Sequence, residues 1–300
     1  MEIQYWKPIT QAYEHMALML FKPFNLGNWF VIGFSAWVAY LFESSFQFHF
    51  NLPGPELWTD EWPWKEGFES VLADHLWLII AATVFVSLVV FALALVLFWV
   101  SARFRFIFLD HVVGDRMDIA KPWRRYARQG NSLFVWWAVF GLLGMTAAIA
   151  LIIPLVILVI HMKETMGAPQ ILGVAGIVML LFLLMVLFQL VLMLLAHFVV
   201  PVMYKHHLRT TEAWRLFLPC LRRHLGPFVL FTLLLAGLHL ALAAVVLAAT
   251  IFTCCCAAIL LAIPYVSAVL MLPVTIFFRA FSLYFLRQFG APFDVMETAP

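Results

Sequence analysis

The fold of this chain is decided by its longest run without a charged residue. Residues 227–278 read PFVLFTLLLAGLHLALAAVVLAATIFTCCCAAILLAIPYVSAVLMLPVTIFF. A helix rises about 1.5 Å per residue, so these 52 residues are too long for one crossing of a hydrocarbon core about 30 Å thick. We therefore expect a hairpin near Thr250–Ala257 that separates two membrane spans, Pro227–Ala249 and Ala258–Phe278.

The composition of the whole chain agrees with that interpretation. Its 300 residues are 65% hydrophobic and 11% charged, and the mean hydropathy is +0.99. An ordinary globular domain is about 45–50% apolar and about 25% charged because water must wet its surface. These figures exclude a single soluble domain, a disordered chain, a disulfide scaffold and a basic nucleic-acid-binding protein.

Four more stretches are long and apolar enough to be spans, since a spanning helix needs about 20 mainly apolar residues. They are Leu26–Phe42, Leu76–Val100, Asn131–His161 and Ile171–Val200. The sequence thus predicts an all-α polytopic membrane protein with six transmembrane helices and cytoplasmic amphipathic interfacial helices. We expect one integral membrane domain over residues 1–300.

The positive charges predict the orientation of these spans. All of the 18 lysines and arginines except Lys65 and Lys163 fall in segments that would share one side of the membrane. Positive residues stay on the cytoplasmic side, so both termini should be cytoplasmic. Residues 51–75, which are acidic and rich in tryptophan, should form an outward-facing loop.

The three cytoplasmic approaches to the odd-numbered spans look alike. Each has a short amphipathic segment, then Gly27, Gly130 or Gly226, then an aromatic-rich span. We interpret them as three parallel two-span repeats, which in membrane proteins are related by an axis along the membrane normal. The repeats would cover residues 9–100, 118–200 and 211–286. The alternative is that any bundle with cytoplasmic loops needs amphipathic lead-ins.

Basic and aromatic residues are interleaved on two of these cytoplasmic segments. Each basic residue near an anionic leaflet contributes about 1 kcal/mol of binding free energy. This pattern favours contact with anionic lipid headgroups or a protein partner, although it could also serve only to set the topology. The candidate contacts are Lys121, Trp123, Arg124, Arg125, Arg128, Arg215, Arg222 and Arg223.

A charged segment continues the second span into the cytoplasm. Either Arg103 or Arg105 could pair with Asp110 there, because an unpaired charge among aromatic residues is costly. We expect a structural ion pair, and a substrate-binding role is the alternative.

No Asp, Glu, Lys or Arg lies near the centre of any predicted span. Proton pumps, ion-coupled carriers and voltage sensors need ionisable groups at that depth, so these classes are disfavoured. Gln189 and His239 are the deepest polar residues and form a candidate intramembrane site. Hydrogen bonding between helices is their alternative role.

Gly144 and Ala148, four residues apart, mark a place where helices could approach closely.

Motifs for soluble-type catalysis are absent from the sequence. There is no metalloprotease His-Glu-x-x-His, phosphate-binding loop, nucleophile elbow or dinucleotide fingerprint. Cys254, Cys255 and Cys256 have neither the spacing nor the histidines of a zinc site. We therefore expect no enzymatic activity, no cofactor and no bound metal.

Three stretches carry a resemblance to a known group of proteins. They are residues 12–30, which end in LFKPFNLGNWF, residues 105–110, RFIFLD, and Pro122-Trp123-Arg124 before Gly130 and Leu133-Phe134. In layout the chain resembles uncharacterised prokaryotic six-span proteins related to the membrane domain found beside some glycerophosphodiester phosphodiesterases. The resemblance implies the plasma (inner) membrane of a prokaryote. It implies no activity, since the phosphodiesterase catalytic domain is missing.

These observations favour a non-enzymatic integral membrane protein that engages lipids or protein partners, as a scaffold or accessory subunit. Its expected partners are anionic lipids on the cytoplasmic side, further copies of itself or a membrane complex, but not nucleic acid. The alternative function is a transporter or channel for an apolar or amphiphilic solute. Gln189 and His239 would then line a cavity opened by kinks at Pro154 and Pro264.

Overall fold

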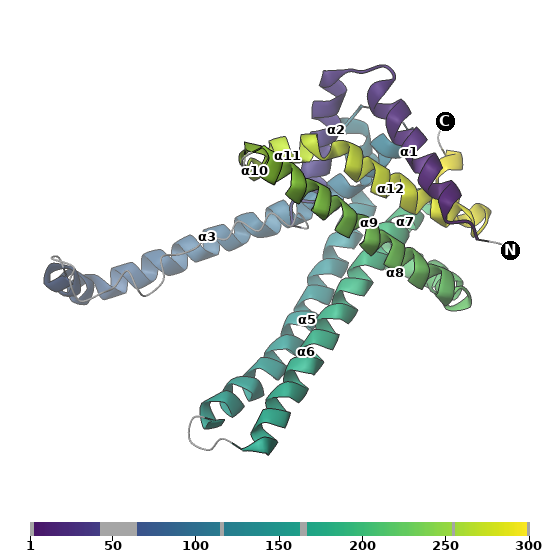
Figure 1. The fold of residues 1–300 in the computed structure, drawn as a ribbon. Coiled ribbons are helices and arrows are strands. Elements are labelled where there is room, and N and C mark those ends of the chain that lie inside the picture. The colour runs from purple at the N-terminus through teal and green to yellow at the C-terminus, as the bar shows by residue number, and fades with distance from the viewer. Residues whose placement is uncertain (1–2, 43–64, 115–116, 163–166, 254–255, 299–300) are drawn as a thin grey trace.

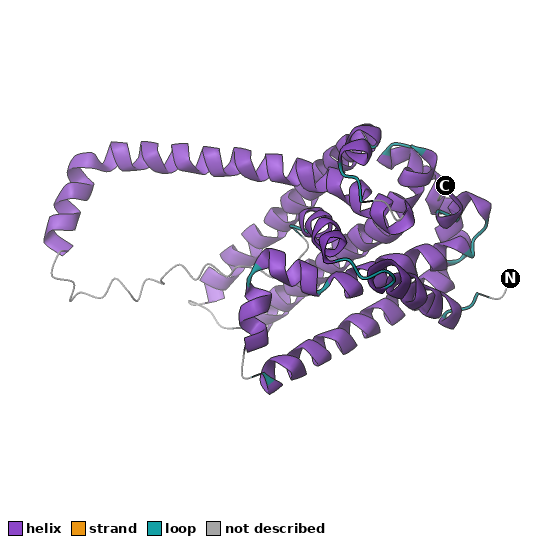
Figure 2. Ribbon diagram, turned by 90° about the horizontal axis from the view of Figure 1, so that it is seen from above, coloured by secondary structure: helices purple, strands orange, loops and turns teal. Residues whose placement is uncertain are grey.

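A computed structural model describes residues 3–42, 65–114, 117–162, 167–253 and 256–298. Throughout these residues the regular elements are helices (Figures 1 and 2), which confirms the expected all-α fold. The helices are α1 (Trp6–Phe21), α2 (Leu26–Ala39), α3 (Lys65–Gly114), α4 (Ala120–Arg125), α5 (Ala127–Met162), α6 (Ala168–Leu194), the π-helix η2 (Leu195–Val199), α7 (Val200–His206), α8 (Thr210–Arg223), α9 (Leu225–Phe252), α10 (Cys256–Ala262), α11 (Pro264–Leu270), α12 (Leu272–Arg287) and the short η3 (Ala291–Phe293) and η4 (Met296–Thr298).

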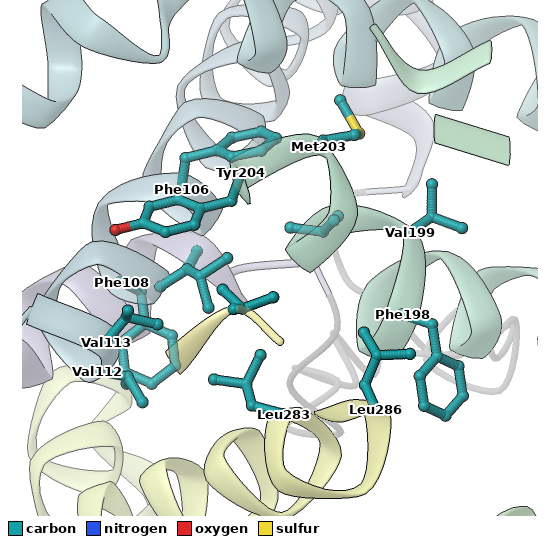
Figure 3. Close-up of a cluster of buried hydrophobic side chains, with 14 of the residues drawn as sticks. Phe106, Phe108, Val112, Val113, Phe198, Val199, Met203, Tyr204, Leu283 and Leu286 are labelled. Atoms are coloured by element: carbon teal, nitrogen blue, oxygen red, sulfur yellow. The ribbon is translucent and has the colours of Figure 1, made fainter. Parts of the chain in front are cut away.

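The core lies where the ends of three helices that are distant in sequence meet. Figure 3 shows Phe106 and Phe108 of α3 on one side of the cluster and Phe198 of η2 on the other, with Leu283 and Leu286 of α12 between them. All five side chains are fully buried, or nearly so. We call the packed region formed by residues 98–114, η2, α7, α12 and the surrounding α1, α2, α4 and α8 the hub. Both described ends of the chain lie at the hub (Figure 1).

Long apolar helices leave the hub as arms (Figure 1). Residues 75–97 of α3 are exposed at every position, and α5 and α6 form a paired arm with an apolar outer surface. By length and composition four helices could cross a membrane, and the bent pair α11–α12 would make a fifth. Such surfaces are compatible with a multi-pass membrane protein, because lipid can cover apolar side chains that water would not.

The first and sixth predicted spans differ from the expectation. The helix α2 has 14 residues, shorter than a full crossing. The sixth stretch is divided into α10, α11 and α12, and the last two are bent by 59°. Pro264 and Pro273 stand at the beginnings of α11 and α12, where the missing proline N–H is tolerated, and so favour new helix starts.

The predicted outward-facing loop is partly helical. Residues 51–64 lie outside the described part of the chain, whereas residues 65–74 form the first turns of α3. The backbone departs from helical geometry at His75, where the apolar run begins. Residues 65–74 of the expected loop are therefore helical, and its outward orientation remains a prediction.

A short helix precedes each of α2, α5 and α9, namely α1, α4 and α8. The first of these does not lie free on a surface, because Ala12 and Leu20 are buried and α1 packs along α12. His15 of α1 also lies 2.8 Å from the carbonyl oxygen of Val112 in α3. The threefold repeat itself remains a prediction.

Candidate functional site

A groove with a volume of about 780 Å³ opens between the beginning of α5 and the beginning of α8. We call it the α5–α8 groove. Its lining combines basic, polar and apolar side chains, which are those of Ala127, Arg128, Asn131, Ser132, Val135, Trp136, Val139, Arg209, Thr210 and Thr211.

The polarity of the groove changes along α5. Arg128 stands at the hub end, Asn131 and Ser132 follow one turn later, and Val135 and Val139 lie further along the arm. At about 1.5 Å per residue, Arg128 and Val139 are roughly 16 Å apart along the helix axis. The groove wall formed by α5 therefore changes from charged to apolar over that length.

Positive charge gathers at the polar end of the groove. Arg128 and Arg209 are both exposed there, one from each helix. The positive end of the α8 dipole also lies here, but it is offset by Glu212 of the first turn, which accepts from the backbone N–H of Arg209 at 2.9 Å. An anion at this end would therefore meet chiefly the two guanidinium groups.

Hydrogen bonds between the two helices hold the floor of the groove together. The hydroxyl oxygens of Ser132 and Thr210 lie 3.1 Å apart, and the backbone N–H of Thr210 donates to Ser132 Oγ at 3.0 Å. These bonds satisfy the first backbone donor of α8, which a helix cannot satisfy within itself. They also fix the distance between the helices.

Asn131 is held by a network that reaches α3 and α4. Its Oδ1 accepts from Trp99 Nε1 at 2.9 Å and from Nε and Nη2 of Arg103 at 3.2 and 3.0 Å. The Arg103 guanidinium lies 4.2 Å from the Trp99 ring and 4.8 Å from the Trp123 ring. A Cβ on Gly130 would lie 2.6 Å from Arg103 Cγ, so glycine allows α3 and α5 to approach here.

The apolar wall is stiffened by stacked rings. Trp136 stacks on Trp214 at 6.0 Å and on Phe140 at 4.7 Å, and Phe140 stacks on Phe188 at 4.7 Å. This ladder joins α8, α5 and α6. Each offset pair is worth about 0.5–1.5 kcal/mol beyond its buried area.

The predicted headgroup contacts differ in where the structure places their side chains. The side chains of Lys121, Arg124, Arg125, Arg128, Arg215, Arg222 and Arg223 are exposed. Of these only Arg128 lines the groove. Lys121 lies 3.4 Å from Asp118, and Trp123 is half-buried against Arg103 rather than facing outward.

The expected ion pair of Asp110 is not among the ion pairs of the described residues. Its Oδ1 instead accepts hydrogen bonds from Tyr204 at 2.7 Å and Tyr126 at 3.4 Å. Burial raises the pKa of the Tyr126 phenol, so this hydroxyl stays protonated and keeps donating. The buried Arg105 guanidinium lies 4.3 Å from the Trp137 ring, and Arg103 belongs to the Asn131 network.

Gln189 and His239 do not meet at the groove. Gln189 is exposed on α6, while His239 on α9 stacks on Phe278 at 4.0 Å and bonds the Leu235 carbonyl oxygen at 2.8 Å. Neither residue lines the α5–α8 groove. In the described part of the chain no three His, Cys, Asp or Glu residues gather as a metal site would require.

Sequence reasoning missed most of the groove. In the sequence, Arg209 is one more cytoplasmic charge, and Asn131 is the beginning of a predicted span. Serine and threonine at the start of a predicted helix, as at Ser132 and Thr210, are signals for capping and not for a ligand. The groove exists because α5 and α8, 78 residues apart at these hydroxyls, lie together.

Comparisons with known proteins give a family and no activity. No curated protein and no solved structure matches the chain. The comparisons show no link to the membrane domain associated with glycerophosphodiester phosphodiesterases. The family model that matches residues 6–271 is described as a family of unknown function, DUF7544, and the chain belongs to that family.

Proposed function

We propose that this protein is a non-enzymatic integral membrane protein that binds anionic phospholipid headgroups in the α5–α8 groove, as a scaffold or accessory subunit. In this proposal six segments cross the plasma membrane of a prokaryote. The hub and both termini face the cytoplasm, where retained positive charges belong.

The observation that carries the proposal is the change of polarity along the groove. A phospholipid changes from a charged phosphate to apolar acyl chains within one leaflet, which is about 20 Å thick including its headgroups. Arg128 and Arg209 suit the phosphate, and Val135, Trp136 and Val139 suit the beginning of an acyl chain. A soluble anion would need no apolar wall, and an uncharged lipid would need no arginines.

The test is retention of lipid by the purified protein. The double variant Arg128→Gln/Arg209→Gln removes both charges of the groove but keeps polar side chains. The matched control, Arg222→Gln/Arg223→Gln, removes two exposed charges from the other end of α8. Native mass spectrometry after incubation with phosphatidylglycerol would count the lipids bound to each protein.

We expect the groove variant to lose bound phosphatidylglycerol at least about tenfold, because hydrogen bonds to a charged group contribute about 1.5–3 kcal/mol. The control should retain the lipid. Equal loss in both variants would show that the attraction is the general charge of the surface, and equal retention would contradict the groove as the site.

Passage of an amphiphilic solute is a second candidate function. One feature favours it, the 59° bend between α11 and α12, because discontinuous helices are typical of transporters. Gln189 and His239 are the residues that this function would use. The test is the flux of a fluorescent lipid in proteoliposomes that contain the Gln189→Leu/His239→Leu variant. An unchanged flux would show that these residues do not serve in passage of the solute.

A further inference from the structure

We infer that the α5–α8 groove selects phosphate headgroups that carry no amine, such as phosphatidylglycerol. This inference rests on the proposed function and narrows its ligand class. It comes from which groups at the groove donate hydrogen bonds and which accept them. The side chains there offer donors, whereas the strong acceptors are already occupied or lie outside the lining.

The first donors are the two arginines. Each guanidinium has five N–H groups and no acceptor. No carboxylate lines the groove among the described residues, and the neighbouring Glu212 carboxylate already accepts from the backbone N–H of Arg209 at 2.9 Å. Headgroup amines would also face repulsion from Arg128 and Arg209, which stand at the polar end.

The next donor is the amide nitrogen of Asn131, and the neighbours of the amide determine which way it points. Trp99 Nε1 and the Arg103 nitrogens can only donate, so the Asn131 atom that faces them must be the amide oxygen. The NH₂ group, with two donors, is therefore the part of this exposed side chain that remains for a ligand.

Arg103 acts as a positioning residue for this donor. Its guanidinium is fixed between the rings of Trp99 and Trp123 at 4.2 and 4.8 Å. The Arg103 side chain fits here because Gly130 has no side chain of its own. The amide of Asn131 thus cannot turn over without presenting its own donors to three other donors.

The hydroxyl oxygens at the floor are already in use. Ser132 Oγ accepts from the backbone of Thr210, and the Ser132 and Thr210 hydroxyls share a hydrogen bond. The phosphate and the glycerol hydroxyls of phosphatidylglycerol can all accept from the remaining donors. A serine or ethanolamine headgroup carries an ammonium with three donors and no acceptor, and the serine carboxylate is bonded to the same carbon as its ammonium, so it cannot approach the donors without it. The lining therefore favours the amine-free headgroup.

Phosphatidylglycerol and phosphatidylserine separate this selection from attraction by charge, because both carry one net negative charge at pH 7. The purified protein would be incubated with an equimolar mixture of the two lipids with identical acyl chains. Native mass spectrometry would then give the ratio of the two bound lipids. We expect phosphatidylglycerol to exceed phosphatidylserine at least about tenfold, the scale of one hydrogen bond to a charged group.

The variant Asn131→Asp tests the proposed residue. An aspartate can still accept from Trp99 and Arg103 with one oxygen, while the second oxygen replaces the NH₂ donor with an acceptor. We expect the ratio to fall to about one or below. The matched control is Asn28→Asp on α2, which adds the same charge outside the groove and should leave the ratio unchanged.

The wild-type ratio decides the inference even if Asn131→Asp does not fold. Equal binding of both lipids, with both lost in Arg128→Gln/Arg209→Gln, would overturn the selection and leave the proposed function standing. No dependence on those arginines for either lipid would instead overturn the proposed function. An unchanged ratio in a folded Asn131→Asp would remove Asn131 from the selection.

Discussion

At the scale of single residues, the hub contains a buried carboxylate that is stabilised by hydroxyl groups. The side chain of Asp110 is almost fully buried, and Tyr204 donates to its Oδ1 at 2.7 Å. Tyr126 donates to the same oxygen at 3.4 Å and stacks on Tyr204 with ring centroids 4.8 Å apart. A buried carboxylate is costly unless it is hydrogen-bonded, so these phenols carry much of the compensation.

The variant Tyr204→Phe removes the shorter bond and keeps the ring in its stack. We expect it to lower the free energy of unfolding by about 1–3 kcal/mol, because the carboxylate loses a donor that water cannot replace. Tyr126→Phe is the matched comparison and should cost less, since its bond is long. Denaturant unfolding in detergent would measure both, and an equal cost for the two variants would contradict this ranking.

What could be predicted at this scale was the exposure of the basic residues. Arg124, Arg125 and Arg222, which the sequence marks as candidate headgroup contacts, have exposed side chains, and the contact itself remains a prediction. The closer hydrogen-bond partner of Asp110, Tyr204, was not predictable, because it belongs to α7 and lies 94 residues away. The role of Asn131 was equally hidden, since local sequence cannot show which donors a distant helix brings to an amide.

At the scale of elements, α5 and α6 come close together at two glycines of their paired arm, Gly144 against Phe188 and Gly173 against Leu158. A Cβ on Gly144 would lie 2.7 Å from Cε2 of Phe188, whereas one on Gly141 would have no atom within 4 Å. Small residues let helix backbones approach in lipid, where no hydrophobic force drives them together. Gly144 therefore lies at a helix contact, and the group that it admits is the Phe188 ring.

We expect Gly144→Leu to destabilise the protein by about 1–3 kcal/mol, the usual cost of overpacking a tight contact. Gly141→Leu on the same helix introduces the same side chain into open space and should cost little. Thermal unfolding in detergent, followed by size-exclusion chromatography, would compare them. A similar loss in both variants would assign the effect to the added leucine and not to the contact.

The elements that could be predicted are those set by local sequence. The expected hairpin near residue 250 agrees with the end of α9 at Phe252 and the beginning of α10 at Cys256. The sixth span shows the limit of this reasoning, because prolines indicate a break but not its angle. Within the broken pair, α11 packs on α2 whereas α12 packs mainly along α1, and only the folded chain brings these neighbours near.

At the scale of the whole molecule, the direction of the arms relative to the hub sets which leaflet meets the groove. The arms lead away from the hub, and both described ends of the chain lie at it (Figure 1). The exposed arginines of α4 and α8 belong to the same end of the molecule as the α5–α8 groove. If positive charges are retained in the cytoplasm, the groove meets the cytoplasmic leaflet.

Accessibility of single cysteines tests this orientation. In a background with the four native cysteines replaced by serine, Pro169→Cys marks the far end of the α5–α6 arm, and Arg222→Cys marks α8 at the hub. A membrane-impermeant maleimide added to intact cells should label the first and not the second. Permeabilised cells should allow labelling of Arg222→Cys, which controls for folding and exposure. The reverse pattern would place the basic groove in the outer leaflet, against the retention of positive charge on which the proposed topology depends.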